Sequence, residues 1–319
     1  MHSTLVRLVP DPLQPAARRA WHLVTLRGSS RIVEWRLRVR ARQTGTLSGH
    51  LLRKMLDDRR ALLTTVADKA SARDYIAEHV GEAYLPRLLA LASSADGIAW
   101  SELPREFVAK VNHGSGGVVI VTHDAEATEA LPPPGSRVNW CSYRIRPERA
   151  DRQSLADLCA HWLTLDYSWT SGQRSIQWCY QDIERRVMVE ELLRDADGYP
   201  PREYRLFVIG GRVRFLQVEM IEDGKECTPV VTPTWETLPA RFLNPLPRQA
   251  PSEPKALLEM IEVAEALGRP LGDFLRVDLY DLGSKIAVGE LTNFPYGGRL
   301  PVRPRSFDRE WARYWPPAG

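Results

Sequence analysis

The chain has 319 residues, of which 44% are hydrophobic and 26% charged, and its formal net charge is +3 at pH 7. This composition allows one or two domains with a substantial core, and no apolar run reaches the ~18 residues that a membrane-spanning helix needs. The cysteines lack metal-binding spacing and the N-terminus lacks a secretory pattern, so we expect a cytoplasmic protein without zinc or disulfides.

Positive charge is concentrated at the start of the chain. Residues 1–60 hold 13 basic groups against four acidic ones, a local net charge of +9. Such an arm suits nucleic acid, an anionic membrane surface or an acidic substrate, and a solvated amphipathic helix behind a leader explains the same residues. No helix-turn-helix, zinc-finger or RNP-like pattern accompanies it, so the sequence does not favour nucleic-acid binding.

The expected elements begin with helices and continue with hairpins. Residues 48–66 carry apolar side chains near a 3.6-residue period and predict one helix, a second helix is expected over 68–79, and 82–91 is expected to close this unit. Runs rich in β-branched residues around glycine turns then predict antiparallel hairpins. The hairpin strands are 106–111 with 118–122, 204–209 with 213–220, and 275–280 with 285–291; helices are expected over 155–165 and 257–267, and a strand over 187–193. This order predicts an α+β fold.

The first group of residues with chemical potential is Lys110-Val-Asn-His-Gly-Ser-Gly-Gly117. A strand brings a lysine to a glycine-rich loop, and glycine allows backbone N–H groups to approach phosphate oxygens closely. The loop is not a Walker A motif, because its lysine precedes the glycines. An ordinary hairpin turn beside a surface lysine has the same pattern.

The second group lies on the last predicted hairpin. Asp278 and Glu290 are 12 residues apart on paired strands, so the hairpin can bring both carboxylates to one edge. Two carboxylates with Thr292 and Asn293 nearby form an oxygen-rich site suited to Mg²⁺ that bridges phosphates. Arg276 precedes Asp278 by two residues and shares its face. An exposed hairpin face with alternating charges is the alternative.

Six short segments occur in order between about residue 57 and residue 301. They are Asp68-Lys69 with Arg73-Asp-Tyr-Ile76, Lys110–Gly117, Val189-Glu-Glu-Leu192, Glu203-Tyr-Arg-Leu-Phe207, Arg276-Val-Asp-Leu-Tyr280 and Gly289-Glu-Leu-Thr292. In this order and spacing they resemble the TupA-like ATP-grasp family, which is named for teichuronopeptide biosynthesis. The resemblance implies an ATP-grasp fold in which ATP lies between two α+β subdomains.

The resemblance also implies which residues hold the nucleotide. Lys69 and Lys110 would approach its phosphates beneath a glycine-rich lid loop, and a hinge strand would read the adenine through backbone groups. The loop residues are His113, Gly114, Ser115, Gly116 and Gly117, and the hinge residues are Glu190, Glu191 and Leu192. For His113 the alternative is a side chain that packs within the loop.

Metal binding and catalysis are implied for the C-terminal strands. Asp278 and Glu290 would hold Mg²⁺, and Thr292 or Asn293 would complete its shell. Arg276 would stabilise the acyl-phosphate and the tetrahedral intermediate that follows. Arg205 stands where relatives usually have lysine, and its planar guanidinium is not equivalent to an ammonium group.

The substrates are less well defined. Relatives read Thr-x-x-Pro-Gly after the metal-binding glutamate, whereas Tyr296 follows the proline here and, with Arg299, implies a different acceptor pocket. Aromatic residues between Trp140 and Trp178 suit a sugar or an aromatic acceptor, or else form core packing. Glu219 and Glu222 suit an amine, or else a solvated strand face.

We therefore expect a basic extension over 1–50, a helical subdomain over 51–105, a lid subdomain over 106–190 and a metal-binding subdomain over 191–319. The expected function is an ATP-dependent carboxylate–amine ligase for a surface polymer or a specialised metabolite. Its substrates would be small or polymer-linked acids and amines. A phosphotransferase that acts on a hydroxyl and a polysaccharide-assembly protein without ligase activity remain the alternatives.

Overall fold

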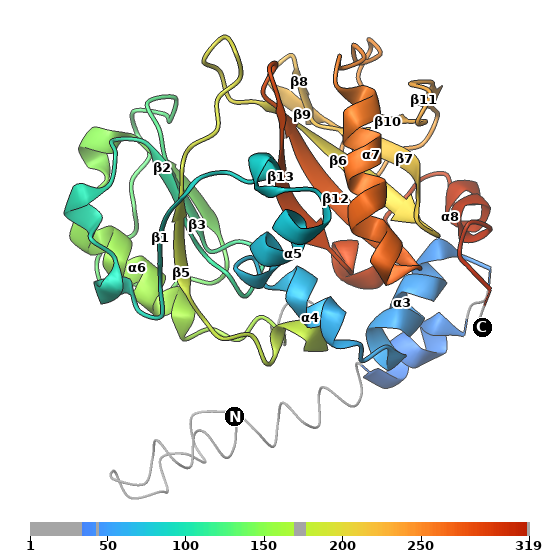
Figure 1. The fold of residues 1–319 in the computed structure, drawn as a ribbon, viewed down its shortest axis with the longest axis horizontal. Helices are drawn as coiled ribbons and strands as arrows, with labels where there is room; N and C mark the ends of the chain where they lie inside the picture. The colour runs from blue at the N-terminus through green and yellow to red at the C-terminus, as the bar shows by residue number, and fades with distance from the viewer. Residues whose placement is uncertain (1–33, 43–44, 169–176, 318–319) are drawn as a thin grey trace, which may run out of the picture.

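Two β-sheets dominate the fold, one from the middle of the chain and one from its C-terminal part (Figure 1). The computed structural model describes residues 34–42, 45–168 and 177–317. Within them, a five-stranded sheet has the order β1-β5-β2-β3-β4 and a six-stranded sheet the order β11-β10-β7-β6-β12-β13. We call these the small sheet and the large sheet. Helices pack on both sheets, which confirms the α+β class.

The strand pairs are antiparallel except β3 with β4. The strands of the small sheet are β1 (Leu88–Ala92), β2 (Phe107–Val111), β3 (Val118–Val121), β4 (Ser142–Ile145) and β5 (Val187–Glu190). Those of the large sheet are β6 (Arg202–Ile209), β7 (Arg212–Val218), β10 (Val230–Val231), β11 (Thr237–Leu238), β12 (Phe274–Asp281) and β13 (Ile286–Thr292), and a separate hairpin joins β8 (Met220–Glu222) to β9 (Lys225–Cys227). The helices are α3 (Leu47–Asp57), α4 (Ala61–Ala67), α5 (Ser71–His79), α6 (Arg152–Leu163), α7 (Leu257–Gly268) and α8 (Ser306–Ala312).

Alternation along β2 gives the small sheet one apolar face and one mixed face. Phe107, Ala109 and Val111 are fully buried in the core that α6 covers with Leu155 and Trp162. Lys110 lies between them in the sequence and therefore points to the opposite face. The predicted hairpin over 106–122 and the predicted helix over 155–165 are confirmed.

The large sheet packs on both faces, and its two faces differ. Leu206 and Val208 of β6 lie in a core with α4, α5 and α7, whereas Phe207 and Ile209 lie in a second core with α3 and Trp311 of α8. This second face is apolar at one end only. Toward its other end it carries charged side chains, because β6 and β12 continue in the same alternation with polar residues.

Both predicted hairpins of the large sheet are confirmed. β6 and β7 join across Gly210 and Gly211, whose φ angles of 62° and 72° fit a tight turn that glycine adopts without strain. α7 lies directly on β6, because a Cβ at Gly268 would come within 2.5 Å of Val208.

The N-terminal helices differ from the prediction in one respect. Residues 34–41 are helical, with Leu37 and Ala41 buried, which agrees with an amphipathic helix in this basic segment. The single helix expected over 48–66 is wrong, because the chain turns between α3 and α4. Asp58 is extended there, with ψ of 130°, and its carboxylate accepts a hydrogen bond from the backbone N–H of Arg60 at 3.0 Å.

Further differences concern β1, α5 and β5. The stretch 82–91 does not close a helical unit, because it contributes β1, which pairs with β5 in the small sheet. α5 begins three residues later than predicted, since the Asp68 carboxylate accepts hydrogen bonds from the backbone of Ala70 and the hydroxyl of Ser71. β5 ends at Glu190 rather than at residue 193.

No helix among the described residues has both the length and the apolarity to span a bilayer.

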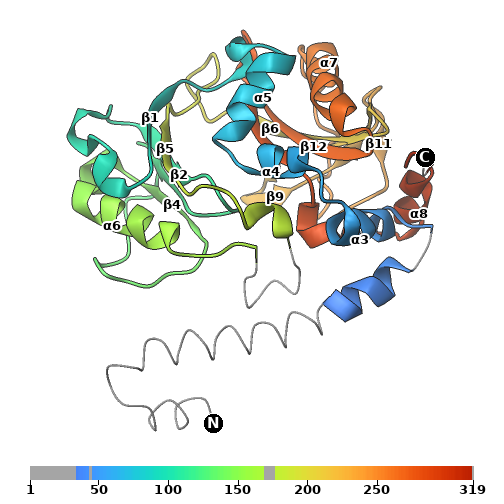
Figure 2. The ribbon, with the colours of Figure 1, turned by 60° about the horizontal axis from the view of Figure 1, so that its bottom comes forward.

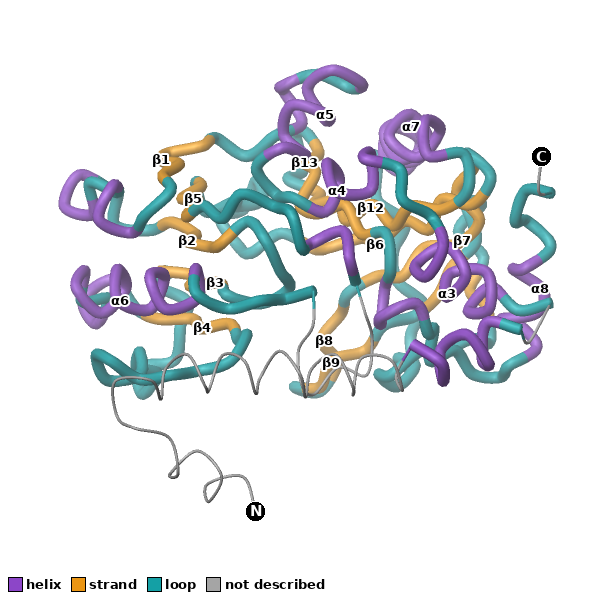
Figure 3. Tube along the Cα trace, turned by 90° about the horizontal axis from the view of Figure 1, so that it is seen from below, coloured by secondary structure: helices purple, strands orange, loops and turns teal. Residues whose placement is uncertain are grey.

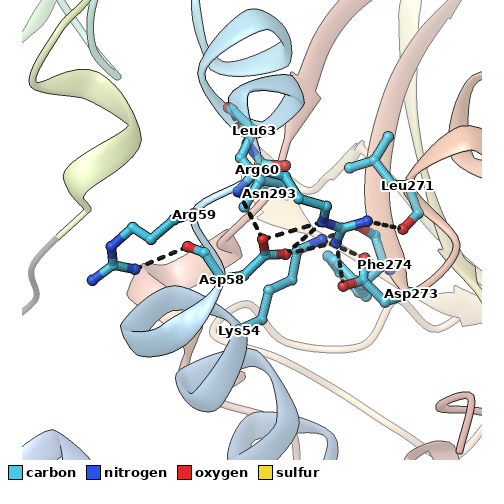
Figure 4. A network of polar contacts seen from close by, with 9 residues as sticks. All are labelled: Lys54, Asp58, Arg59, Arg60, Leu63, Leu271, Asp273, Phe274 and Asn293. Atoms are coloured by element: carbon cyan, nitrogen blue, oxygen red, sulfur yellow. Dashed lines mark hydrogen bonds and ion pairs between the residues drawn. The ribbon is translucent and has the colours of Figure 1, made fainter. Parts of the chain in front are cut away.

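In the turned views α4 lies over the large sheet, where its Leu63 and Val66 share a core with Leu291 of β13 (Figures 2 and 3). A polar network beneath it joins the α3–α4 turn to the start of β12 (Figure 4). The side chain of Lys54 is 1% exposed and donates to Asp273 Oδ1 at 2.6 Å and to the carbonyl of Phe274 at 2.8 Å. Arg60 reaches the other oxygen of Asp273 at 2.8 Å. Burial lowers the pKa of Lys54, and Asp273 opposes that shift.

We predict that Lys54→Met destabilises the protein by about 3 kcal/mol, because Asp273 then loses a buried charged partner. The measurement is denaturant unfolding. Arg248→Met is the matched control: Arg248 pairs with Asp223 at 3.2 Å while 82% exposed. It should cost less than about 1 kcal/mol. Equal costs for the two variants contradict a structural role for the Lys54 network.

Candidate functional site

A cleft with a volume of about 1470 Å³ separates the mixed face of the small sheet from the charged end of the large sheet. Val108, Lys110 and Ile120 line it from β2 and β3. Asp278 and Glu290 line it from β12 and β13. The two groups that the sequence singled out therefore face the same space.

The two carboxylates lie directly opposite each other, since Asp278 is the register partner of Glu290. A β-bulge follows, because Leu279 pairs with Val288 and Gly289 is left over. This extra residue lets Glu290 share a face with Asp278 although Val288, two residues away, packs in the core. Glycine is required at the bulge, where a Cβ would lie 2.5 Å from the ring of Tyr280.

Arginine and lysine side chains offset the charge of this pair. Arg276 binds both oxygens of Asp278, with Nε to Oδ1 at 2.7 Å and Nη2 to Oδ2 at 2.6 Å. The Nζ atom of Lys69 lies 2.9 Å from Glu290 Oε1. Burial raises the pKa of Asp278 to about 7, Arg276 opposes the shift, and Glu203 and Glu290 add to it. Burial also opposes ionisation of Glu290, yet Lys69 and then Arg276 hold the pKa of Glu290 below its ordinary value.

Lys69 also connects the large sheet to the glycine-rich loop. Its Nζ donates to the carbonyl of Gly114 at 2.6 Å, in addition to its ion pair with Glu290. The backbone N–H of Lys69 donates to the carbonyl of Asn112 at 3.1 Å. One residue in the turn between α4 and α5 thus holds the loop and the carboxylate in a fixed relation.

Arg205 forms a second charged group beside the first. It is the register partner of Asp278, and it binds Glu203 at 2.5 Å and Glu219 at 3.0 Å. Burial and the neighbouring Glu203 raise the pKa of Glu219. Sequence reasoning assigned no role to Glu203, although a position two residues before Arg205 on a strand predicts a shared face.

Across the cleft, Lys110 forms an ion pair with Glu190 of the neighbouring strand β5. Arg73 of α5 binds the other oxygen of Glu190 at 2.7 Å. The side chain of Glu190 is 7% exposed, and although burial opposes it, Lys110 and Arg73 hold the pKa of Glu190 below its ordinary value. Glu190 therefore positions Lys110, and its backbone is paired with strands on both sides.

Packing explains the glycines of the loop. A Cβ at Gly114 would lie 2.8 Å from Trp140 and 3.1 Å from Tyr167, and one at Gly117 would lie 2.8 Å from Val111. Gly116 and Gly117 also have φ angles of 83° and 64°, which disfavour other residues. The glycines thus let the loop lie against aromatic side chains, and its tip exposes Ser115 to the cleft.

His113 packs within the loop. It is 1% exposed, its ring meets Trp140 edge to face at 5.2 Å, and its Nε2 donates to the carbonyl of Leu165 at 3.1 Å. Burial lowers the pKa of His113 to about 4, and the Leu165 carbonyl opposes the shift.

The structure gathers many, but not all, of the predicted site residues at the cleft. Those that line it are Lys69, Lys110, Ser115, Gly116, Glu190, Glu191, Leu192, Arg205, Arg276, Asp278 and Glu290. His113, Gly114 and Gly117 do not line it, and Thr292 lines a smaller cavity next to it. Asn293 faces away from Glu290, since its Nδ2 donates to the carbonyl of Leu63 at 2.8 Å.

Most of the described aromatic side chains between Trp140 and Trp178 pack against other parts of the protein. Trp162 is fully buried and stacks on Tyr143, Trp140 packs on the loop, and Trp178 lies under the guanidinium of Arg59. Tyr167 lines the smaller cavity. Trp169 lies outside the described residues. Glu222 accepts hydrogen bonds from the backbone of Arg248.

The donor set fits a magnesium ion that is shared with phosphates. Asp278 and Glu290 offer carboxylate oxygens from adjacent strands, and Mg²⁺ is commonly held by one or two carboxylates together with substrate phosphates. No group of three or more His, Cys, Asp or Glu side chains suited to a metal ion occurs among the described residues. An all-protein cage is thus not present in this part of the chain.

Comparisons with known proteins identify the family of this chain. The family model described as TupA-like ATPgrasp matches residues 49–132 and 148–314. No curated protein matches the chain.

Several solved structures are similar to the chain. They include the ATP-grasp ligase PsnB complexed with minimal precursor, at 12% identity and TM-score 0.36 over 79% of this chain and 61% of that one. The D-alanine–D-alanine ligase from Bacillus anthracis has 15% identity and TM-score 0.38 over 74% of this chain and 59% of that one. The N5-carboxyaminoimidazole ribonucleotide synthetase from Thermotoga maritima has 11% identity and TM-score 0.33 over 78% and 44%. The chain thus spans less than two thirds of each of these structures.

We predict that His113 makes stability depend on pH. The unfolded chain binds a proton at His113 near pH 6.5, whereas the folded protein does so only near pH 4. The unfolded state therefore binds more protons between these values, and stability falls as the pH is lowered from 6.5 toward 4. His113→Gln should weaken this loss, measured by denaturant unfolding at several pH values. His123→Gln removes an exposed imidazole and should retain the wild-type slope. An unchanged slope in His113→Gln contradicts the assignment.

Proposed function

Because the chain belongs to the TupA-like ATPgrasp family, we propose that it is an ATP-dependent ligase that joins a carboxylate to an amine. One observation carries the proposal. Asp278 and Glu290 face each other on β12 and β13, across a cleft from Lys110 and Ser115, and Lys69 joins the two sides. Such an arrangement supplies acidic groups for a metal ion and basic groups for the same phosphate chain.

The nucleotide would lie along the small sheet. The N–H group of Leu192 makes no hydrogen bond within the described part of the chain, and Leu192 lines the cleft where β5 ends. This N–H group is suited to the edge of an adenine ring. At the other end of the cleft, Lys110 and the backbone N–H groups of Ser115 and Gly116 would receive the phosphates.

The metal would lie on the large sheet, held by Asp278 and Glu290. When bound, Mg²⁺ supplies positive charge that offsets the charge developing on the transferred phosphoryl group. Burial raises the pKa of Asp278, and Glu203 and Glu290 raise it further, so the positive charge of the metal would favour the ionised carboxylate. Arg276 would then have part of its charge available for the phosphoryl acceptor.

The proposed reaction has two steps. A carboxylate oxygen attacks the γ-phosphorus, the bond from that phosphorus to the β,γ-bridging oxygen breaks, and ADP leaves. The amine nitrogen then attacks the acyl carbon, the bond from this carbon to the phosphate oxygen breaks, and phosphate and a proton leave. Activation is needed because the carboxylate itself has no adequate leaving group.

In the proposed reaction the chain's own residues would act mainly by positioning the substrates and by offsetting their charge. Arg276 is 13% exposed in its side chain and lies 3.7 Å from Glu290, and this position supports a role beside the acceptor carboxylate and the phosphoryl group. Arg205 lies one strand further and holds Glu203 and Glu219. The glycine-rich loop, which Lys69 holds through the carbonyl of Gly114, would exclude water from the acyl-phosphate.

We predict that Asp278→Asn lowers acid-dependent release of ADP by roughly 100-fold, because one of two metal-binding charges is lost while the shape is retained. The measurement is ADP formation with Mg²⁺, a panel of acids and hydroxylamine as the amine. Asp96→Asn, an exposed change on the small-sheet side, is the control and should keep wild-type activity.

Activity of Asp278→Asn within about twofold of wild type overturns the proposed site. A product phosphorylated on a hydroxyl, formed without any amine, identifies a phosphotransferase instead.

A further inference from the structure

A second, smaller cavity adjoins the cleft. Its volume is about 230 Å³, and four residues line both spaces: Ser115, Arg276, Glu290 and Tyr296. A group that enters the small cavity therefore lies next to the point where the proposed phosphoryl group meets Arg276. This volume is below the range of drug-sized ligand sites, which begins at about 300 Å³.

Two polar side chains of this cavity make no hydrogen bond to any residue that the structure describes. The hydroxyl of Thr292 is buried and has no partner among those residues. Gln177 is 6% exposed, and its side-chain amide makes no hydrogen bond within the described part of the chain. A buried hydroxyl without a partner is costly, so Thr292 favours a ligand that offers it a hydrogen bond. The amide of Gln177 lines the same cavity and can offer that ligand a donor and an acceptor.

Aromatic rings form the other walls. Tyr167 and Tyr180 meet edge to face at 4.8 Å, and Phe294 closes the cavity beside Thr292. Burial raises the pKa of Tyr180 well above its ordinary value, so this phenol stays neutral. Rings of this kind pack against the apolar part of a small ligand.

Tyr296 stands at the junction of the two spaces in an uncommon conformation. Its φ of 54° and ψ of 30° are left-handed, and it stacks on Phe242 at 5.7 Å. Non-glycine residues in this region are strained and concentrate at functional sites. The chain thus holds an aromatic side chain where the small cavity meets the cleft.

We propose that this cavity binds the body of the acid substrate, and that the acid is compact and carries a hydroxyl or an amide group. The carboxylate would lie beside Arg276 and Ser115, and the polar group would bind Thr292 and Gln177. This inference rests on the proposed ligase function. It also assigns Thr292 to the substrate rather than to the metal.

The test uses pairs of acids that differ in one group. Lactate is compared with isobutyrate, where a methyl replaces the hydroxyl, and succinamate with 4-oxopentanoate, where a methyl replaces the amide nitrogen. Hydroxylamine traps any acyl-phosphate: its nitrogen attacks the acyl carbon, the bond to the phosphate oxygen breaks, and a hydroxamate, phosphate and a proton result. Hydroxamate and ADP are both measured.

We expect the hydrogen-bonding acid of at least one pair to have a kcat/KM at least about tenfold higher in the wild type. Thr292→Val and Gln177→Leu should bring this ratio toward one while the KM for ATP stays unchanged. Gln153→Leu, on the exposed side of α6, is the matched control and should keep the wild-type ratio. Binding of ATP verifies that each variant is folded. If a variant does not fold, the ratio of the two kcat/KM values in the wild type decides the outcome.

The outcomes separate this inference from the proposed function. Hydroxamate formation with equal kcat/KM within both pairs, or a ratio that survives both variants, overturns the assignment of the cavity and leaves the ligase function standing. No acid-dependent ADP or hydroxamate with any of the four acids overturns both.

Discussion

Two carboxylates that lie opposite each other on neighbouring strands repel each other, and burial increases the cost. Asp278 is 4% exposed, and its register partner Glu290 shares the same face. The site therefore depends on the basic groups that offset these charges. Arg276 does so from within β12, and Lys69 does so from the turn between α4 and α5 while it also holds the carbonyl of Gly114. One ammonium group thus joins the helical unit, the glycine-rich loop and the large sheet.

The same principle explains the opposite wall of the cleft. Glu190 is buried between β1 and β2, and it is stable as a carboxylate because Lys110 and Arg73 bind its two oxygens. The amino group of Lys110 is therefore held in place before any ligand binds. A preorganised charge costs little reorganisation when a phosphate arrives, which is the condition under which electrostatic stabilisation is most effective.

Local patterns predicted much of this architecture. Glycine turns between β-branched runs located the hairpins, and the two-residue period placed Arg276 on the face of Asp278. Local patterns could not predict the bulge at Gly289, because the need for glycine there comes from the ring of Tyr280 on the neighbouring strand. The sequence also did not predict the break between α3 and α4. There Arg60 donates a hydrogen bond to Asp273, which lies more than two hundred residues away in sequence. The glycine-rich loop was located correctly, but the contacts that require its glycines come from Trp140, Tyr167 and Val111.

The central claim is that both walls of the cleft hold the same triphosphate. A crystal structure of the protein with Mg²⁺ and a non-hydrolysable ATP analogue tests it most directly. We predict that the triphosphate lies between Lys110 and Ser115 on one side and Asp278 and Glu290 on the other, with the metal ion on these two carboxylates. A nucleotide bound outside the cleft, or a metal ion that neither carboxylate contacts, would contradict the account.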